Sequence, residues 1–546
     1  MEPEQEYGNV EYKLKLSDTS KERIERLASQ MRFRCNEGNS ECIYNIGVED
    51  DGTMTGLTED EFNNTLLCLK KAAEINQYSI TLICKSPTCE SKALYEFLIR
   101  ETNNNSYIDI KVAIAGSVDC GKSTLLSVLV SGKSDNGRGS GRLSVFNFPH
   151  EVESGRTSSI GHQIVGYDID GSIMNYAHGR QHSWPDIVKT SSKIISFLDL
   201  AGHEKYLKTT IFGLTSAQPD LALIMISANR GILKMTLEHI FLCKTLHIPF
   251  CIVITKIDMV KDKDNVLLST IESIYNILKK PGIRRMPLKI KDIDDVVRAA
   301  LHISSESIVP IFSVSNVTLE GITNLHKFLN LVPKKSIQVN STEVECHLND
   351  SWTVNGVGTV FGGHLISGCI RIGDKLWFGP NNNKYVSIIV KSIQCKKVPI
   401  QSIHTQSYIT IGVRGHKDII HKTHFKRGNV LLGSSTQQIL CTELIANVEV
   451  LKTHSTTIKI GYQPMMHANN VKCCVTINKI ENKICQRRNE NTDEILRTGD
   501  SALVTLSLCF ECKFIKENTD ILLCEGKTKV IGRILKVNQL NQSPPL

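Results

Sequence analysis

The sequence predicts a multidomain protein built around an α/β domain with a doubly wound, mainly parallel sheet. Three observations lead to this prediction. The chain has 546 residues, several times the roughly 100–200 residues of one domain. Its middle part alternates apolar strand-like runs with helical stretches, which is typical of a parallel sheet covered by helices. Beyond residue 337 the helical period ends, and short apolar runs separated by turns predict two β-barrels.

Residues 1–105 form the first predicted unit, an N-terminal α+β extension. Alternating apolar residues indicate its strands, and apolar residues at helical spacing indicate its helices. This part of the chain carries no recognisable chemical motif. The expected elements are, in order, a strand at 10–16, a helix at 21–34, a strand at 43–48, a helix at 59–75 and a strand at 79–85.

Residues 106–334 form the predicted α/β domain, which follows a polar break of three asparagines. Strands that alternate with helices are expected to lie parallel, and ligands of such sheets collect where the strands end. The segment 166–193 does not fit the alternation, and we expect a hairpin insertion there. The predicted strands lie at residues 111–115, 194–198, 221–227, 250–255 and 308–314.

The two β-barrels are expected at residues 335–434 and 435–546, and the second ends in a short loose tail. Turn pairs such as Asn355-Gly356 and Gly433-Ser434 separate their strand-like runs. Such short runs with frequent turn signals are typical of sandwiches and barrels.

The composition excludes several classes of protein. Hydrophobic residues make up 41% of the chain and charged residues 22%, which argues against disorder and fibrous repeats. No apolar run approaches the roughly 18–20 residues of a membrane span, and the first residues show no secretion signal. Most of the 18 cysteines lie in apolar runs, where a reduced thiol acts as a small hydrophobe. We expect a cytoplasmic monomer without a membrane partner.

The net charge is +8, which permits a nucleic-acid partner without requiring one. We expect RNA rather than DNA. Basic side chains gather in two predicted loops, and the alternative for each is an ordinary solvated surface. They are Lys279, Lys280, Arg284, Arg285, Lys289 and Lys291 in one loop, and His421, Lys422, His424, Lys426 and Arg427 in the other.

A glycine-rich loop follows the first strand of the α/β domain. It reads G-x-x-x-x-G-K-S and leads into an apolar helix, the setting that a phosphate-binding loop requires. Its glycines let backbone N–H groups wrap the phosphates, and the helix N-terminus adds positive partial charge. We expect Lys122 to meet the β and γ oxygens and Ser123 to hold Mg²⁺. The predicted nucleotide contacts are Gly116, Ser117, Val118, Asp119, Cys120, Gly121, Lys122, Ser123 and Thr124.

The next predicted strand ends at an aspartate. An aspartate at a strand end downstream of a phosphate loop can hold Mg²⁺ through water, and the Gly202 N–H can meet the γ-phosphate. His203 is then expected to face the reacting phosphate; the alternative is an ordinary surface histidine. The predicted nucleotide contacts here are Asp199, Leu200, Ala201, Gly202 and His203.

A third predicted strand delivers a carboxylate that can recognise guanine. The Asp258 carboxylate can accept from both N1–H and the 2-amino group of guanine, and adenine offers no such pair. The turn at Ser315 and Asn316, after the last predicted strand, is expected to donate to guanine O6. The remaining contacts expected in this motif are Thr255, Lys256 and Ile257.

The segment between the phosphate loop and Asp199 contains a run of hydroxyl side chains. We expect Thr157 to close over Mg²⁺ and the γ-phosphate and to release them after hydrolysis. Ser158 or Ser159 are alternative ligands, and a plain polar loop is the alternative to any such role. The predicted metal ligands are Ser123, Thr157 and Asp199.

The motifs GSVDCGKST, DLAGHEKY and TKID together resemble those of translational GTPases of the elongation factor Tu and elongation factor 1 alpha class. ESGRTSSIG, SDNGRG and PIFSVSNVT are similar to the branch of GTP-binding protein 1 and GTP-binding protein 2. GNVEYKLKL near the start and VNGVGTVFGG in the first predicted barrel extend the likeness over nearly the whole chain. The resemblance implies an N-terminal extension, a P-loop GTPase domain and two β-barrels.

The resemblance also implies roles for individual residues. Val118 matches the hydrophobic gate of the phosphate loop, Thr157 the magnesium-binding threonine and His203 the histidine that positions the attacking water. We expect His203, Lys122 and Asp119 to take part in catalysis. The chain departs from the usual elongation-factor residues at Ser117, Cys120, Arg156, Ala201 and Thr255, and Arg156 stands where a second hydrophobic gate residue is expected.

We therefore expect a protein that binds GTP and GDP with Mg²⁺, hydrolyses GTP, and acts as a switch on tRNA and the ribosome. The resemblance implies slow hydrolysis without a ribosome. The alternative is a GTP-dependent scaffold that recruits proteins of RNA turnover. A nucleotide-binding relic without turnover is a third, remote interpretation.

Overall fold

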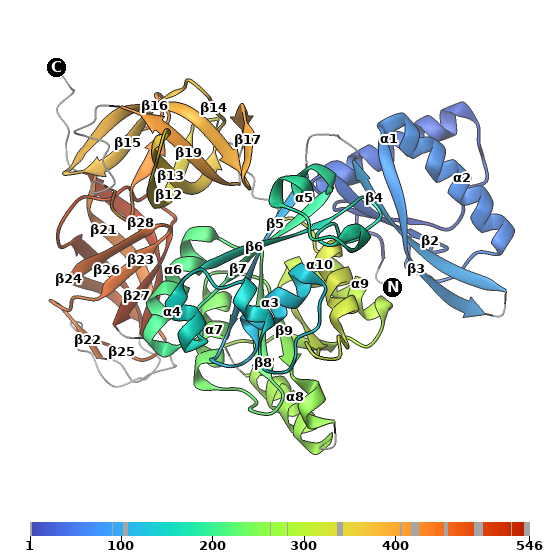
Figure 1. The fold of residues 1–546 in the computed structure, drawn as a ribbon, viewed down its shortest axis with the longest axis horizontal. Coiled ribbons are helices and arrows are strands. Elements are labelled where there is room, and N and C mark those ends of the chain that lie inside the picture. The colour runs from blue at the N-terminus through green and yellow to red at the C-terminus, as the bar shows by residue number, and fades with distance from the viewer. Residues whose placement is uncertain are drawn as a thin grey trace.

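The computed structural model arranges the chain in four units, which Figure 1 colours from blue at the N-terminus to red at the C-terminus. The N-terminal extension lies at one end, the α/β domain in the middle and the barrels at the other end. The structure describes residues 3–89, 91–101, 107–261, 264–280, 282–335, 342–404, 407–415, 425–451, 457–484, 495–525 and 527–539. The expected loose tail, NQSPPL, lies outside these ranges.

The N-terminal extension is a four-stranded sheet in the order β1-β2-β4-β3, packed against two helices. Helix α2 begins at a capping box, in which Thr58 Oγ1 accepts from the Glu61 N–H and Glu61 Oε2 accepts from the Thr58 N–H. Strand β4 is absent from the sequence prediction. The bounds are β1 (Val10–Lys13), α1 (Lys21–Glu37), β2 (Glu41–Ile46), α2 (Glu59–Asn76), β3 (Tyr78–Cys89) and β4 (Lys92–Glu101).

The α/β domain contains a seven-stranded sheet in the order β10-β11-β9-β8-β5-β7-β6. Its neighbours pair in parallel except β6, which runs antiparallel to β7. The mainly parallel sheet is therefore confirmed, and β6 and β10 are additions to the predicted strands. The bounds are β5 (Ile108–Gly116), β6 (Gly161–Tyr167), β7 (Lys193–Asp199), β8 (Leu221–Ser227), β9 (Phe250–Thr255), β10 (Met286–Lys289) and β11 (Ile308–Ser313).

Helices cover both faces of this sheet, as the doubly wound prediction requires. Helices α3, α9 and α10 pack on one face, and α6, α7 and α8 on the other. No helix within the described ranges is both long and apolar enough to cross a membrane. The bounds are α3 (Lys122–Ser131), α4 (Pro149–Ser154), α5 (Trp184–Thr190), α6 (Leu207–Ala217), α7 (Lys234–Thr245), α8 (Asp264–Leu278), α9 (Ile293–His302) and α10 (Ile322–Leu331), with short 3-10 helices η1 (Gly141–Ser144), η2 (Ala177–Gly179), η3 (Glu204–Tyr206), η4 (Ile257–Val260) and η5 (Ile303–Ser305).

The segment 166–193 is more than the simple hairpin that the sequence analysis expects. It joins the antiparallel strands β6 and β7, but it carries η2 and helix α5 between them. The Asn175 side chain holds its start, because it accepts from the Gly166 N–H and donates to the Ile164 carbonyl. Apolar residues of α5 pack on β6.

Two closed β-barrels follow, as predicted. The first barrel closes through the pairing of β15 with β16, and the second through the pairing of β21 with β28. The sheet of the first barrel contains β12 (Glu345–Val354), β13 (Gly358–Ser367), β15 (Lys375–Asn381), β16 (Lys384–Cys395), β17 (Val398–Ile400), β19 (Tyr408–Arg414) and β20 (Val430–Leu432). The second barrel contains β21 (Cys441–Val450), β23 (Met465–Ala468), β24 (Val471–Ile484), β26 (Ser501–Leu508), β27 (Asp520–Glu525) and β28 (Lys527–Gln539). Each unit also carries a separate two-stranded sheet: β14 (Ile370–Arg371) with β18 (Ser402–Ile403) in the first, and β22 (Thr457–Lys459) with β25 (Ile495–Arg497) in the second.

The amino ends of two central strands are fixed by buried ion pairs. At the start of β7, Lys193 Nζ donates to Glu41 Oε1 of the extension at 2.9 Å and to the Val332 carbonyl at 2.6 Å. Glu41 Oε2 also accepts from Arg100 Nε at 3.1 Å. Burial lowers the pKa of Lys193 to about 8, and the Glu41 carboxylate opposes that shift. The extension and the α/β domain therefore share one charged network.

The first barrel is joined to the same edge of the sheet. Lys396 Nζ donates to Asp109 Oδ2 at 2.6 Å and to Ser196 Oγ at 2.9 Å, which ties the barrel to the start of β5 and the middle of β7. Burial alone would raise the pKa of Asp109, but Lys396 and Ser196 lower it below its usual value. The Lys193 and Lys396 ion pairs both lie toward the amino ends of the strands. The phosphate loop follows the carboxyl end of β5 and therefore lies on the opposite side of the sheet.

Glu41→Gln should destabilise the fold by about 3 kcal/mol or more, because Arg100 and Lys193 then stay buried without their carboxylate. In the variant, folded Lys193 loses its proton before unfolded Lys193 does, so the loss should shrink as pH rises toward 8. Thermal unfolding at pH 6 and pH 8 measures both effects. The control is Glu37→Gln, at an exposed carboxylate of α1. Equal melting of the two variants would contradict this account.

Candidate nucleotide-binding site

The phosphate loop lies at the carboxyl edge of the parallel sheet, between β5 and α3. Two of its glycines meet separate backbone requirements. Gly116 has a φ of 150°, and a Cβ there would lie 2.6 Å from the Met225 carbonyl oxygen. Gly121 has a φ of 86° and immediately precedes α3. The loop can therefore pass close to β8 and present the N–H groups of the α3 N-terminus to an anion.

Lys122 is buried inside this loop. Its Nζ donates to the carbonyls of Ser117 at 2.8 Å and Gly116 at 3.3 Å. Gly202 lies so close that a Cβ there would be 2.3 Å from Lys122 Nζ. The segment after β7 thus contacts the lysine of the phosphate loop directly, and a larger residue at position 202 would displace one of them.

Three oxygen-bearing side chains from three segments meet beside Lys122. Ser123 Oγ lies 2.6 Å from Asp199 Oδ2 and 2.9 Å from Thr157 Oγ1, and Thr157 Oγ1 lies 3.5 Å from Asp199 Oδ2. Asp199 Oδ1 is buried and has no hydrogen-bond partner among the described residues. Burial raises the pKa of Asp199 to about 6, against the opposing effect of Ser123. Hard oxygen donors with an unsatisfied carboxylate oxygen fit Mg²⁺.

Ser158 and Ser159, the alternative ligands, are engaged elsewhere. Both donate backbone N–H and side-chain O–H groups to Glu151 Oε1, at 2.7–3.0 Å. Although burial would raise the pKa of Glu151, these hydrogen bonds lower it to about 2. Glu151 therefore holds the segment so that Thr157 turns toward Ser123. Sequence reasoning missed this role, because a glutamate two turns upstream has no distinctive spacing.

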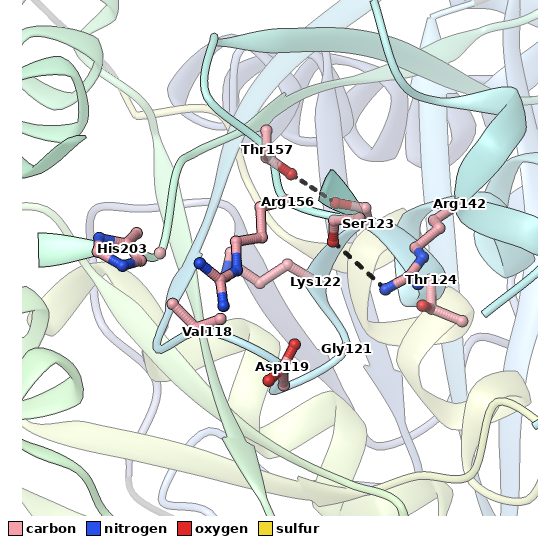
Figure 2. Close-up of a pocket in the computed structure, with 12 residues that line it drawn as sticks. Val118, Asp119, Gly121, Lys122, Ser123, Thr124, Arg142, Arg156, Thr157 and His203 are labelled. Atoms are coloured by element: carbon pink, nitrogen blue, oxygen red, sulfur yellow. Dashed lines mark hydrogen bonds between the residues drawn. The ribbon is translucent and has the colours of Figure 1, made fainter. Parts of the chain in front are cut away.

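His203 contributes to the pocket wall, but its ring points outward (Figure 2). Its Nδ1 accepts from the Lys205 N–H at 3.1 Å, so the side chain caps η3. The ring must leave this hydrogen bond to reach a nucleotide. Asp119, the other acidic candidate of the loop, forms a half-exposed ion pair of 3.3 Å with Arg230.

The expected guanine motif is assembled from β9 and β11. Asp258 Oδ1 accepts from Ser315 Oγ at 2.6 Å, and Ser315 Oγ accepts from the Val317 and Thr318 N–H groups. Lys256 adopts a left-handed φ of 60° between the strand and η4. The carboxylate is thus oriented before any base binds.

Thr255 joins the guanine motif to the phosphate loop. Its hydroxyl donates to the Cys120 carbonyl at 2.7 Å, and Cys120 is fully buried. The hydroxyl also lies 3.4 Å from the Ile226 carbonyl, so its proton is used within the protein and the side chain has no donor left for a base. Nearby, Asn316 is 7% exposed, and its Oδ1 has no partner among the described residues.

The pocket also contains two arginines. Arg156 is the residue that departs from the family pattern at the gate position, where a charged role near the γ-phosphate is open, and the sequence analysis does not name Arg142. Arg142 is positioned by Asp135, whose carboxylate accepts from the N–H groups of Gly137, Gly139 and Gly141. The only sequence signal for this arrangement is the glycine-rich run around Arg138, which also suits an ordinary loop. The side chains that line the pocket come from Val118, Asp119, Lys122, Ser123, Thr124, Arg142, Arg156, Thr157 and His203.

Comparisons with known proteins agree with this geometry. The model of the elongation factor Tu GTP binding domain matches residues 109–335. GTP-binding protein 2 of Homo sapiens is 37% identical over 550 aligned residues, which cover 98% of this chain and 88% of that protein. The chain belongs to the family of GTP-binding protein 1 and GTP-binding protein 2. This family falls within the translational GTPases, as the domain match shows, and this member is a GTPase.

Two further comparisons support the assignment. GTP-binding protein 1 of Xenopus laevis is 36% identical, and the alignment covers 98% of the present chain and 80% of the Xenopus protein. The solved structure of translation elongation factor SelB from Methanococcus maripaludis with the GTP analogue GPPNHP has a TM-score of 0.55 at 17% identity, and the match covers 80% of each chain. That similarity shows the shared fold of a GTPase domain with barrels.

Asp258→Asn should weaken GTP binding about 10- to 100-fold, because an amide cannot accept from both N1–H and the 2-amino group. Xanthosine triphosphate carries a carbonyl in place of the 2-amino group, so it should bind the variant better than GTP. Competition for a fluorescent guanine nucleotide measures both. Asp170→Asn, at an exposed aspartate, should change neither affinity. If Asp258→Asn still binds GTP better than xanthosine triphosphate, residues other than Asp258 recognise the base.

Proposed function

We propose that this GTPase is an elongation-factor-like nucleotide switch that acts on tRNA and the ribosome. The observation that carries the proposal is a cationic cluster where three units meet. Lys208 lies on α6 of the GTPase domain, Arg427 comes from the first barrel and Lys472 from β24 of the second. Burial, and then the charges of Arg427 and Lys208, lower the pKa of Lys472. Cations that repel each other in this way favour an anion, such as an RNA phosphate, between them.

Contacts of α6 provide a route from the nucleotide to this cluster. Thr210 Oγ1 of α6 donates to the Ala201 carbonyl at 2.7 Å, beside Gly202. Arg427 stacks over Phe212 of α6 at 4.5 Å, and α6 also packs on β23 of the second barrel. When GTP becomes GDP, Gly202 loses its γ-phosphate partner, and a shift of α6 separates the cluster.

The nucleotide roles in this proposal follow the geometry above. Loop residues Gly116 to Thr124 bind the phosphates, and Asp258 with Ser315 and Asn316 binds guanine. Ser123, Thr157 and Asp199 would hold Mg²⁺, which would supply positive charge against the phosphates of the nucleotide. Lys122 leaves its loop carbonyls for the β and γ oxygens.

Of the two basic loops in the sequence, the first contributes less to RNA binding than its composition suggests. Arg285 is buried, donates to Glu306 and stacks over Phe250 at 5.6 Å, so it stabilises the α/β domain. Lys279, Lys280 and Arg284 remain exposed. In the second loop, His421, Lys422 and His424 lie outside the described residues.

His203→Ala should lower GTP hydrolysis stimulated by ribosomes and aminoacyl-tRNA about 100-fold, because the stimulated state needs the ring turned toward the attacking water. The slow rate without ribosomes should change little, since the ring points outward in this structure. Phosphate release with and without ribosomes measures both rates. Wild-type protein that binds GTP tightly but is not stimulated would favour the scaffold of RNA turnover instead.

Lys472→Ala should weaken tRNA binding in the presence of a non-hydrolysable GTP analogue and lower the slope of log affinity against log salt by about one. The reason is the loss of one phosphate contact. Filter binding at several salt concentrations measures the slope. The control is Lys459→Ala, at an exposed lysine of β22 in the same C-terminal unit. If the two variants change tRNA affinity and the salt slope equally, the cluster is not the RNA-binding site.

A further inference from the structure

Arg156 is a cationic residue of the phosphate pocket whose side chain is not paired with a described residue. It lines the pocket with an exposed side chain, and it forms no hydrogen bond or ion pair with any residue that the structure describes. The other cations around the pocket are engaged: Lys122 with loop carbonyls, Arg142 with the Gly155 carbonyl and Arg230 with Asp119. A free guanidinium beside a phosphate site is a donor without its acceptor.

The backbone carries Arg156 to the reacting end of that pocket. Helix α4 ends at Ser154, and Gly155 turns the chain with a φ of 64°. Two residues after Gly155, the Thr157 side chain reaches the proposed Mg²⁺ position. In Figure 2, the Arg156 side chain extends from this segment toward Val118 and Lys122, while the His203 ring points away. In this conformation, the arginine faces the phosphate space and the histidine does not.

Arg142 fixes the turn that presents Arg156. Its Nη1 donates to the Gly155 carbonyl at 3.4 Å, and a Cβ on Gly155 would lie 3.1 Å from its Nη2. The guanidinium therefore packs against Gly155, and Gly139 of the loop around Asp135 also lies close to it, since a Cβ there would be 3.1 Å from Arg142 Nε. We treat Arg142 as a positioning residue, because its donor is used on the protein backbone.

From this geometry we propose that Arg156 is a catalytic residue, an arginine supplied by the chain itself that binds the γ-phosphoryl oxygens most tightly in the transition state. The proposal rests on the binding of GTP in this pocket. Water oxygen bonds to the γ-phosphorus, the bond to the β–γ bridging oxygen breaks, and its electron pair stays with GDP. Phosphate and the proton of water leave. Arg156 stabilises the charge that shifts onto the transferred oxygens and the bridging oxygen.

This role explains why a polar residue stands at a position where the resemblance leads one to expect a hydrophobic gate. A hydrophobic gate would control access of the histidine to water. A guanidinium there instead supplies charge before any ribosome binds. The slow, unstimulated reaction is therefore assigned to Arg156, and the stimulated reaction adds His203.

The test is single-turnover GTP hydrolysis by the full chain without ribosomes. Arg156→Ala should lower the rate about 100-fold or more, whereas its affinities for GDP and for a non-hydrolysable GTP analogue should stay within about threefold. Its affinity for GDP with aluminium fluoride, a mimic of the transferred phosphoryl group, should fall with the rate. Arg156→Lys should recover part of the rate, because a lysine keeps the charge without the planar fork. Arg138→Ala, at an exposed arginine of the loop before Arg142, is the matched control and should behave as wild type.

Chemical rescue separates charge from structure. Millimolar guanidinium chloride should raise the rate of Arg156→Ala at least several-fold above that with equal potassium chloride, and it should not accelerate the wild type. An unchanged rate in Arg156→Ala would overturn the proposal, and so would equal weakening of GDP and GTP-analogue binding with no fall in rate. If the wild-type protein does not bind guanine nucleotides, the assignment of the pocket is refuted, and so is the catalytic role of Arg156.

Discussion

Three side-chain oxygens that lie within 3.5 Å of one another set the geometry of this molecule, because each comes from a different segment. Ser123 begins α3, Asp199 ends β7 and Thr157 precedes β6. They converge because β5 and β7 are parallel neighbours whose carboxyl ends lie at one edge. The Oδ1 atom of Asp199 is buried and has no hydrogen-bond partner among the described residues. The protein part of the proposed Mg²⁺ site is thus already assembled.

Much of the site follows from the sequence, because its backbone requirements are local. The phosphate loop needs glycines and a helix start, and Asp199 and Asp258 each follow an apolar run that becomes a strand or its end. The parallel sheet and both barrels follow from hydrophobic periodicity for the same reason. The roles of the individual site residues remain predictions. The domain boundaries at residues 105, 334 and 434 also remain predictions.

Other features depend on tertiary contacts that no local pattern encodes. The outward ring of His203 depends on a backbone N–H two residues later, and the place of Arg142 depends on Asp135 across a loop. The sequence analysis does not predict strands β6 and β10, which lie at the two ends of the sheet and pair with one neighbour each. Thr255 shows the same limit: its hydroxyl serves the phosphate loop, which a motif comparison cannot reveal.

The network of Glu41, Arg100 and Lys193 also decides how separable the N-terminal extension is from the α/β domain. Lys193 is a fully buried residue of the central sheet, yet its carboxylate partner belongs to the N-terminal extension. Removing the extension would take away both the carboxylate partner of Lys193 and part of the chain that packs beside it. The extension is therefore not an interchangeable module, and a graft onto another translational GTPase would need a matching cation at the start of the strand.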